Sequence, residues 1–297
     1  MIAQQFLRQY AYASGVEEDV AQLEIVLTYA LQRIGELGLW RRLALKGGTS
    51  LRKTVFGTSG RFSQGIDLLA TDQETPNVED ALVDGLTHEP FHGLTFNVQD
   101  YRYSQGGNFG VQVSYQHAYG RGVFELQVSH RSDLVLSPVD AELLPQSYFP
   151  RLEFRPGSVT NVHRVEMLAE KVLACARRLG GSGKDVYDLY QYAQRPFEIS
   201  LLRSLVCAKA WTDGVQFDPD GFLARLEPRA FNWTELRGLL GRGLLLDQAQ
   251  ACRTVQERLA SLRELTALEQ RVLADTTYHR DHAAYGQLAD EARSMVG

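Results

Sequence analysis

The spacing of apolar residues changes between residues 150 and 160, and this change limits the folds that the chain can adopt. Before it, several segments alternate apolar and polar residues with a period of two. In the segment 122–130, for example, Phe124, Leu126 and Val128 share one side of an extended chain, and the residues between them face the other side. After it, helical spacing dominates. The sequence therefore predicts an α+β fold whose second half is almost entirely helical.

The helical half begins with a stripe of apolar residues at positions i, i+3, i+4, i+7 and i+11: Val165, Leu168, Ala169, Val172 and Ala176. Four later stretches have the composition of further helices: KDVYDLYQYAQ, SLLRSLVCAKAW, NWTELRGLLG and AQACRTVQERLASLRELTALEQRVLAD. We predict one domain over residues 1–155 and a helical domain over residues 156–297. We also expect the helical domain to pack on the sheet and to complete its active site.

The first half is predicted to mix helices and strands around a glycine-rich turn. Residues 17–36 have helical spacing, and Leu43–Leu45 have the pattern of a short buried strand that leads into KGGTSL. Two glycines followed by Thr49 and Ser50 are typical of a tight turn that opens a helix. The other expected elements are a strand at 66–70, a helix at 78–86 and strands at 94–100, 109–117 and 122–130.

Composition and charge narrow the class of protein. The 297 residues are 44% hydrophobic and 23% charged, as in soluble globular proteins. No apolar run approaches membrane-spanning length and the N-terminus lacks a signal-peptide core, so we expect a cytoplasmic protein that does not enter a membrane. Cys175, Cys207 and Cys252 lie far apart without a CxxC pair, which predicts reduced, buried thiols. The net charge of −5 argues against a surface that coats nucleic acid indiscriminately.

Three features of the first half fit the transfer of a nucleotidyl group from a nucleoside triphosphate. A glycine-rich helix start offers free N–H groups and a favourable dipole to the phosphates. Carboxylates on different strands, here Asp67 and Glu125, can hold the metal ions that stabilise the attacking and leaving oxygens. Each feature alone has a simpler interpretation: the double glycine as a plain turn, Asp67 as a cap of a neighbouring amide, and Glu125 as the solvent side of an edge strand.

Five motifs follow one another along the chain: LALKGGTSLRK, RFSQGIDL, VFELQVSHR, EMLAEKVLACARR and KDVYDLYQY. Together they resemble the motifs of the AbiEii/AbiGii family of nucleotidyltransferase toxins. This family includes the MenT toxins of toxin–antitoxin operons. The resemblance extends from about Leu43 to Tyr192, with a weaker echo in FNWTELRGLL. It implies a minimal nucleotidyltransferase sheet with flanking helices, followed by a helical C-terminal region. It also implies a toxin with a cognate antitoxin, which uses Mg²⁺ to move an NMP unit from an NTP to the 3′ end of tRNA and so blocks translation.

The resemblance assigns roles to individual residues of the first half. The nucleotide-binding turn corresponds to Gly47, Gly48, Thr49 and Ser50. Asp67 corresponds to the second aspartate of the family's DxD pair, and Glu125 occupies the position of a third carboxylate. Both would be metal ligands and catalytic residues.

The resemblance also assigns three residues of the helical half. Lys171 matches a lysine that would contact the triphosphate as a point charge. Asp185 and Asp188 match an acidic motif that would orient either the attacking hydroxyl or this lysine. Without the resemblance, the favoured interpretation of Asp185 is an acidic residue that favours a helix N-terminus.

The chain departs from the family pattern at Gly65, where that pattern has the first aspartate of the DxD pair. With Asp67 and Glu125 alone, we expect weaker metal binding and impaired catalysis. Two explanations are open: an engineered or selected change that inactivates a toxin, or a natural protein that has lost catalysis and acts by binding. Because glycine slightly destabilises a strand, we expect no structural need for it.

Two other functions fit the same sequence. The first keeps the fold and changes the acceptor, which gives a protein nucleotidyltransferase or a kinase-like regulator. The second is a non-catalytic module that binds NTP or RNA and sequesters a partner.

Overall fold

The computed structural model describes residues 3–71, 78–103, 108–130, 134–177, 181–244 and 246–296, which cluster in two compact units. The first unit comprises the described residues of Met1–Ser132, Pro138–Val162 and Gly238–Leu244. The second comprises those of Asp133–Ser137, His163–Arg237 and Leu245–Gly297. The main change of unit therefore falls between Val162 and His163, and each unit also takes in a short segment from elsewhere in the chain.

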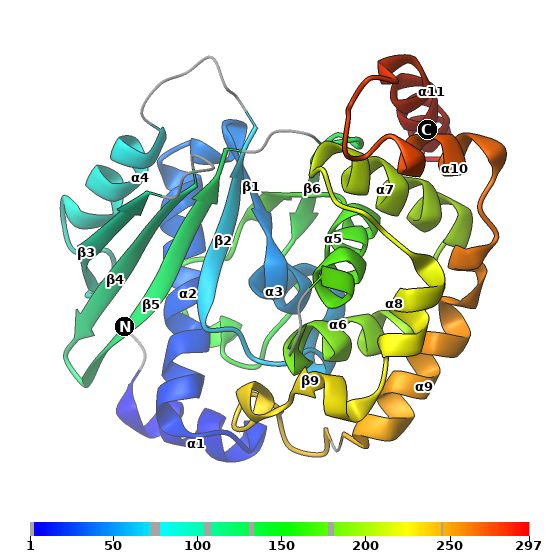
Figure 1. Ribbon diagram of the computed structural model, residues 1–297. Coiled ribbons are helices and arrows are strands. Elements are labelled where there is room, and N and C mark those ends of the chain that lie inside the picture. Colours follow the sequence, from blue (N-terminus) through cyan, green and yellow to red (C-terminus); the bar gives the residue numbers. More distant parts are fainter. Residues whose placement is uncertain are drawn as a thin grey trace. The chain divides into compact units, whose positions relative to one another are not determined.

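The first unit is built on a mixed seven-stranded sheet with the strand order β3-β4-β5-β2-β1-β7-β6 (Figure 1). Its strands are β1 (Leu43–Lys46), β2 (Gly65–Ala70), β3 (Thr95–Tyr103), β4 (Phe109–His117), β5 (Gly120–Ser129), β6 (Val139–Glu142) and β7 (Ser158–Asn161). β2 pairs antiparallel with β1 and parallel with β5, whereas β3, β4 and β5 form an antiparallel meander. Every strand expected from the sequence is present, and β6 and β7 are additional.

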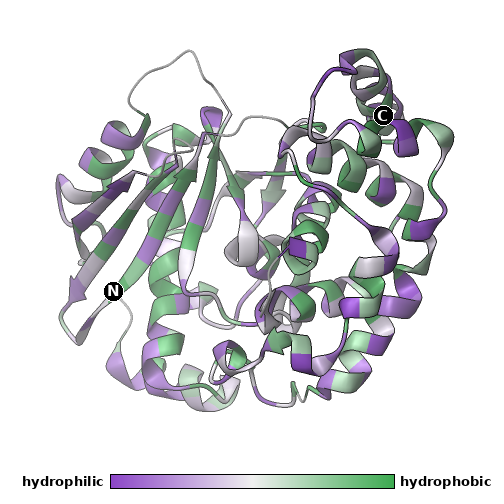
Figure 2. Cartoon of the chain, in the orientation of Figure 1, coloured by the Kyte–Doolittle hydropathy of each residue, from purple (hydrophilic) through white to green (hydrophobic). Residues whose placement is uncertain are grey.

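One face of this sheet packs with helices into a single core, and the alternation of the strands explains which face. Ile66 and Leu68 of β2 and Phe124 and Leu126 of β5 are at most 2% exposed. They pack in one cluster with residues of α1 (Gln4–Ser14), α2 (Glu18–Glu36) and α4 (Val78–Thr87). The intervening residues of β4 and β5 form the polar face, and the alternation appears as green and purple bands along these strands (Figure 2). This polar face carries the candidate site.

The second unit is helical, as the sequence predicts, apart from a short parallel pair of strands. Its helices are α5 (Arg164–Arg177), α6 (Gly183–Ala193), α7 (Ile199–Thr212), α8 (Pro219–Arg225), α9 (Gln248–Arg258), α10 (Ala267–Ala274) and α11 (His282–Ser294). The strands are β8 (Gly181–Ser182) and β9 (Phe231–Asn232). Among the described residues, no helix combines the length and the apolarity that a membrane crossing requires.

Two predictions about the second half have clear outcomes. The helix expected over NWTELRGLLG is wrong, because only Thr234–Leu236 form a 3₁₀ turn and Gly238, with φ of 76°, takes a left-handed conformation that no α-helix continues through. The prediction of reduced thiols is confirmed, since all three cysteines are buried and free of disulfides.

Candidate active site

The glycine-rich turn joins the end of β1 to a helix. The helix α3 (Gly47–Ser50) follows Lys46 directly and continues as a π-helix over Leu51–Phe56. Gly47 has φ of 72°, a conformation that residues with a side chain rarely adopt. The first N–H groups of a helix have no carbonyl partner within it and lie at the positive end of its dipole. The turn therefore has the backbone geometry of an anion-binding helix start.

Asp67 lies directly against this turn. In the β1–β2 pairing Lys46 is the register partner of Asp67, and a Cβ atom on Gly47 would overlap the Asp67 carboxylate. A Cβ atom on Gly48 would likewise come within 2.5 Å of the guanidinium of Arg61, which is 7% exposed. Both glycines thus leave room for a charged side chain. Sequence reasoning did not single out Arg61, although the motif RFSQGIDL begins with it.

The hydroxyl groups of the turn are held inside the protein. Thr49 donates to the carbonyl oxygen of Gly65 and bonds the hydroxyl of Ser63 at 2.6 Å. Ser50 donates to Oδ1 of Asn161 on β7 at 2.6 Å. Both Thr49 and Ser50 are fully buried. Their side chains therefore brace the turn, and its backbone amides are the groups suited to a phosphate.

A buried cluster of charges follows the turn. The ammonium of Lys53 lies 2.9 Å from Glu24 Oε1 and also donates to Thr28 and Tyr148, at 2.9 Å and 2.8 Å. Arg52 lies 3.4 Å from the same Glu24 oxygen. Burial lowers the pKa of Lys53 to about 8 although Glu24 opposes this shift. Burial alone would raise the pKa of Glu24, but Lys53 and Arg52 outweigh it and lower that pKa.

Glu125 shares the polar face with Asp67. In the parallel β2–β5 pairing Glu125 is opposite Gly65 and Gln127 is opposite Asp67, so the two carboxylates occupy diagonal positions. Strand spacing puts their Cα atoms about 8 Å apart. The Glu125 side chain is 42% exposed, and its Oε1 lies 3.4 Å from Gln112 and 3.8 Å from Arg102. Within the described residues no group of three or more potential metal-binding side chains occurs.

Gly65 has a structural reason that the sequence did not reveal. A Cβ atom at position 65 would overlap the backbone carbonyl oxygen of Glu125, its register partner on β5. A backbone atom cannot rotate away as the end of a side chain can. The expectation of no structural need for glycine here is therefore wrong: in this β2–β5 geometry, any larger residue requires one of the two strands to shift.

The second unit brings together the three residues assigned there. Lys171 on α5 contacts Asp185 at 2.6 Å and Asp188 at 3.1 Å, and both aspartates lie on α6. The exposed fractions of the side chains are 15% for Lys171, 10% for Asp185 and 2% for Asp188. Together they carry one positive and two negative charges. Of the two roles open to the aspartates, this geometry shows contact with the lysine.

Sequence reasoning missed a second polar group beside this cluster. Ser182, the N-cap of α6, donates to Glu235 at 2.6 Å, and Lys184 lies 3.3 Å from the same carboxylate. The hydrogen bond from Ser182 and the charge of Lys184 lower the pKa of Glu235 against a smaller effect of burial. The pairing of Ser182 with Asn232 explains this arrangement, because it places FNWTELRGLL next to the start of α6. In the sequence, the signal for this polar group was the weaker resemblance of FNWTELRGLL to the family motif.

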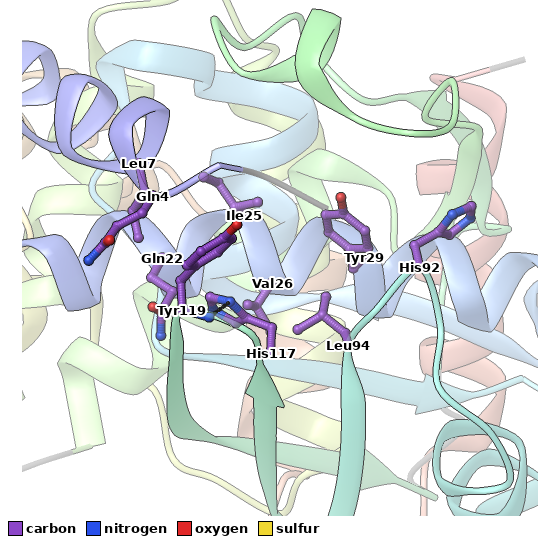
Figure 3. Close-up of a pocket in the computed structure, with 10 residues that line it drawn as sticks. All are labelled: Gln4, Leu7, Gln22, Ile25, Val26, Tyr29, His92, Leu94, His117 and Tyr119. Carbon is purple, nitrogen blue, oxygen red and sulfur yellow. Dashed lines mark hydrogen bonds between the residues drawn. The ribbon is translucent and has the colours of Figure 1, made fainter.

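A cavity lies elsewhere in the first unit (Figure 3). It encloses about 390 Å³ of space that is partly open to solvent. Its lining comes from α1, α2, the segment before β3, the end of β4 and the β4–β5 turn, and comprises Gln4, Leu7, Gln22, Ile25, Val26, Tyr29, His92, Leu94, His117 and Tyr119. None of the sequence-predicted site residues lines it.

A helix start lies beside a strand aspartate, and a second carboxylate lies on the next strand of the sheet. The chain matches the family described as "Nucleotidyl transferase AbiEii toxin, Type IV TA system" over residues 29–270. The chain therefore belongs to the AbiEii family, whose members are nucleotidyltransferase toxins of type IV toxin–antitoxin systems.

The solved structures include one strong match. MenT4, a nucleotidyltransferase toxin of Mycobacterium tuberculosis H37Rv, is 26% identical, with a TM-score of 0.84 over 99% of this chain and 100% of that one. JHP933 of Helicobacter pylori is 14% identical, with a TM-score of 0.48 over 84% of this chain and 94% of that one. A further Helicobacter pylori structure, described as a "putative nucleotidyltransferase", is 15% identical, with a TM-score of 0.49 over 84% of this chain and 96% of that one. No curated protein matches the chain.

Proposed function

We propose that this toxin transfers an NMP unit from an NTP to the 3′ hydroxyl of an RNA acceptor in the cytoplasm, and that the acceptor is tRNA. In this reaction the 3′ oxygen forms a bond to the α-phosphorus, and the bond to the β-phosphate oxygen breaks to release pyrophosphate. A tRNA extended at its 3′ end cannot be aminoacylated, which accounts for toxicity. A cognate antitoxin would oppose this activity.

The observation that carries the proposal is the position of Asp67 against the Gly47 turn. Backbone N–H groups at the start of α3 suit the terminal phosphates of an NTP. The Asp67 carboxylate adjoins the same glycine, so the phosphates and this carboxylate would share one small volume. The buried bonds of Thr49 and Ser50 keep the turn in place before substrate arrives.

The donor set on the polar face fits Mg²⁺. This cation is commonly held by one or two carboxylates together with substrate phosphates, so Asp67 and Glu125 would suffice as protein ligands. When bound, Mg²⁺ would supply charge neutralisation at the phosphate oxygens. The family pattern has a further carboxylate where this chain has Gly65. We therefore expect weaker Mg²⁺ binding here, and impaired transfer at low Mg²⁺ concentration.

Lys171 and its two aspartates would serve the same reaction. Two carboxylates within 3.1 Å hold the direction of the ammonium. An ammonium with this support is suited to contact a triphosphate as a point charge. We propose that the turn and carboxylates of the first unit and the lysine of the second are all required for transfer.

The test uses the chain with each of the four NTPs, labelled at the α-phosphate, and total RNA at several Mg²⁺ concentrations. Labelled RNA with at least one nucleotide is the expected result. Asp67→Asn, nearly the same in shape, should abolish it, and RNA whose terminal diol has been oxidised by periodate should take no label.

The outcomes separate the other functions. Label on protein instead of RNA would indicate a protein nucleotidyltransferase. Transfer of label in a parallel assay with γ-labelled NTP, without transfer of α-label, would indicate a kinase. Absence of label at every Mg²⁺ concentration, with toxicity retained in Asp67→Asn, would indicate a binding module. A Gly65→Asp variant is a poor control, because the backbone of Glu125 leaves no room for its Cβ atom.

A further inference from the structure

We propose that the polar face of β3, β4 and β5 binds the unpaired nucleotides at the 3′ end of the acceptor, through amide side chains that contact the bases. This inference rests on the proposed RNA acceptor and names the surface that would hold it. The residues at the registered positions of this face are Thr95, Asn97, Gln99, Arg102, Gly110, Gln112, Ser114, Gln116, Arg121, Val123, Glu125 and Gln127. We call these residues the amide face.

The strand register aligns the amide face with the candidate active site. One row across the strands runs from Gln99 through Gln112 and Glu125 to Gly65. The next row runs from Arg102 through Gly110 and Gln127 to Asp67. A four-stranded sheet face is wide enough to hold two or three unpaired bases in known RNA-binding domains. A strand of RNA that follows these rows would end at the catalytic carboxylate.

The composition of the face suits bases better than a protein partner. Gln99 and Gln127 are exposed, and an amide side chain carries a donor and an acceptor that match the edge of a base. Val123, at 52% exposure, is the one aliphatic side chain among the registered positions described. Protein interfaces instead have apolar and aromatic residues at their centres.

The charge of this face suits a polyanion although the whole chain has a net charge of −5. Arg102 and Arg121 lie on it, and Lys46 is in register with Asp67 at its inner edge. Against these three cations stand Asp67 and Glu125, which a bound cation would neutralise further. Arg102 reaches Glu125 at 3.8 Å across Gly110, which has no side chain to block it. That contact is exposed and long, so a phosphate can replace it.

The test measures binding of a labelled single-stranded RNA of about eight nucleotides by fluorescence anisotropy. The ligand for comparison is an abasic oligonucleotide of the same length. The variants are Gln99→Ala combined with Gln127→Ala, and Arg102→Ala separately; all three residues are exposed, which favours retained folding. Gln287→Ala, an exposed amide on α11, is the matched control.

We expect the double variant to bind the RNA at least ~10-fold more weakly and to lose the preference for RNA over the abasic chain. Arg102→Ala should weaken the binding of the RNA and of the abasic oligonucleotide by the same factor. For the double variant, the KM for NTP and the thermal midpoint should not change. An unaltered preference in the double variant, while the protein still labels RNA, would overturn this inference alone. Failure of the unmodified chain to label or bind RNA would overturn the proposed function with it, and variants that lose antitoxin binding but keep RNA binding would assign the face to the antitoxin.

Discussion

The two units each contain a lysine held by carboxylates, and the two lysines differ in exposure. Lys53 in the first unit is completely covered and has Arg52 and Glu24 beside it, so this cluster has one more cation than carboxylates. Lys171 in the second unit keeps 15% exposure and has two aspartates, so this cluster has one more carboxylate than cations. The residue type and the presence of a carboxylate partner would not by themselves distinguish these two lysines.

The difference indicates which lysine holds the fold and which is available to a ligand. Lys53 bonds α2 through Glu24 and Thr28 and also bonds Tyr148, so its hydrogen bonds go to the protein interior. It fixes the helix that follows the nucleotide turn. Lys171 keeps some exposure to solvent, and Asp185 and Asp188 hold its ammonium in place. We therefore expect loss of Lys53 to unfold the protein and loss of Lys171 to stop its reaction.

The largest effect is expected for Lys53→Met. This change leaves Glu24 buried with less compensation, and removal of one partner from a buried pair costs about 3–5 kcal/mol of unfolding free energy. Urea denaturation followed by circular dichroism measures it. A double variant that adds Glu24→Gln should recover part of the loss. A cost below about 1 kcal/mol would show that this cluster does not stabilise the fold.

Lys171→Met should lower kcat/KM for nucleotide transfer by about 100-fold or more, equivalent to about 2.7 kcal/mol in the transition state. Its denaturation midpoint should fall less than that of Lys53→Met, because Lys171 is not fully covered. Steady-state kinetics with labelled NTP provide the measurement. If Lys171→Met and the original chain had the same kcat/KM, Lys171 would have no role in the reaction.

Gly65→Ala should cost about 1–3 kcal/mol, because its Cβ atom meets the Glu125 carbonyl and forces a strand to move. The matched control is Gly286→Ala in α11, where no atom lies within 4 Å of the added Cβ. That control should stabilise the protein by up to about 1 kcal/mol through helix propensity. If Gly65→Ala were as stable as the original chain, position 65 would tolerate the aspartate of the family pattern.

The smallest expected effect is on the pH dependence of the free energy of unfolding, and it comes from Lys53. The pKa of Lys53 is about 8 in the folded protein and 10.5 as its ordinary value, so the folded state binds fewer protons than the unfolded state between these values. The free energy of unfolding should therefore rise from pH 8 to 9.5, by about 1.5 kcal/mol relative to Lys53→Met. Denaturation curves at both pH values test this. A parallel response in the two proteins would exclude Lys53 as the cause.

Much of the candidate site could be predicted from the chain because it depends on local pattern. The period-two alternation in 109–117 and 122–130 predicted which residues lie on the same face of each strand. The strands in the structure begin and end within two residues of the predicted bounds. The same alternation put Asp67 and Glu125 on the polar side. The family motifs singled out Lys171, Asp185 and Asp188, and the structure shows that they are in contact.

Other features depended on contacts between distant residues and could not be predicted. The segment LRKTVF after the turn has no marker of burial, yet Lys53 is covered by residues 25, 29 and 95 positions away in sequence. Gly65 looked like a missing ligand because the neighbour that requires it, the Glu125 carbonyl, belongs to another strand. The α-helix expected over NWTELRGLLG is absent because Gly238 takes a left-handed conformation there.

The sequence by itself determined the order of elements, the face on which each strand residue lies and the family, since these follow from periodicity and short motifs. The tertiary structure alone decided which charges are covered, which hydroxyls brace the turn and why position 65 is glycine. The physical reason is that burial and steric overlap are properties of residues brought together across the sheet, and the register that brings them together is set by the packing of the whole unit.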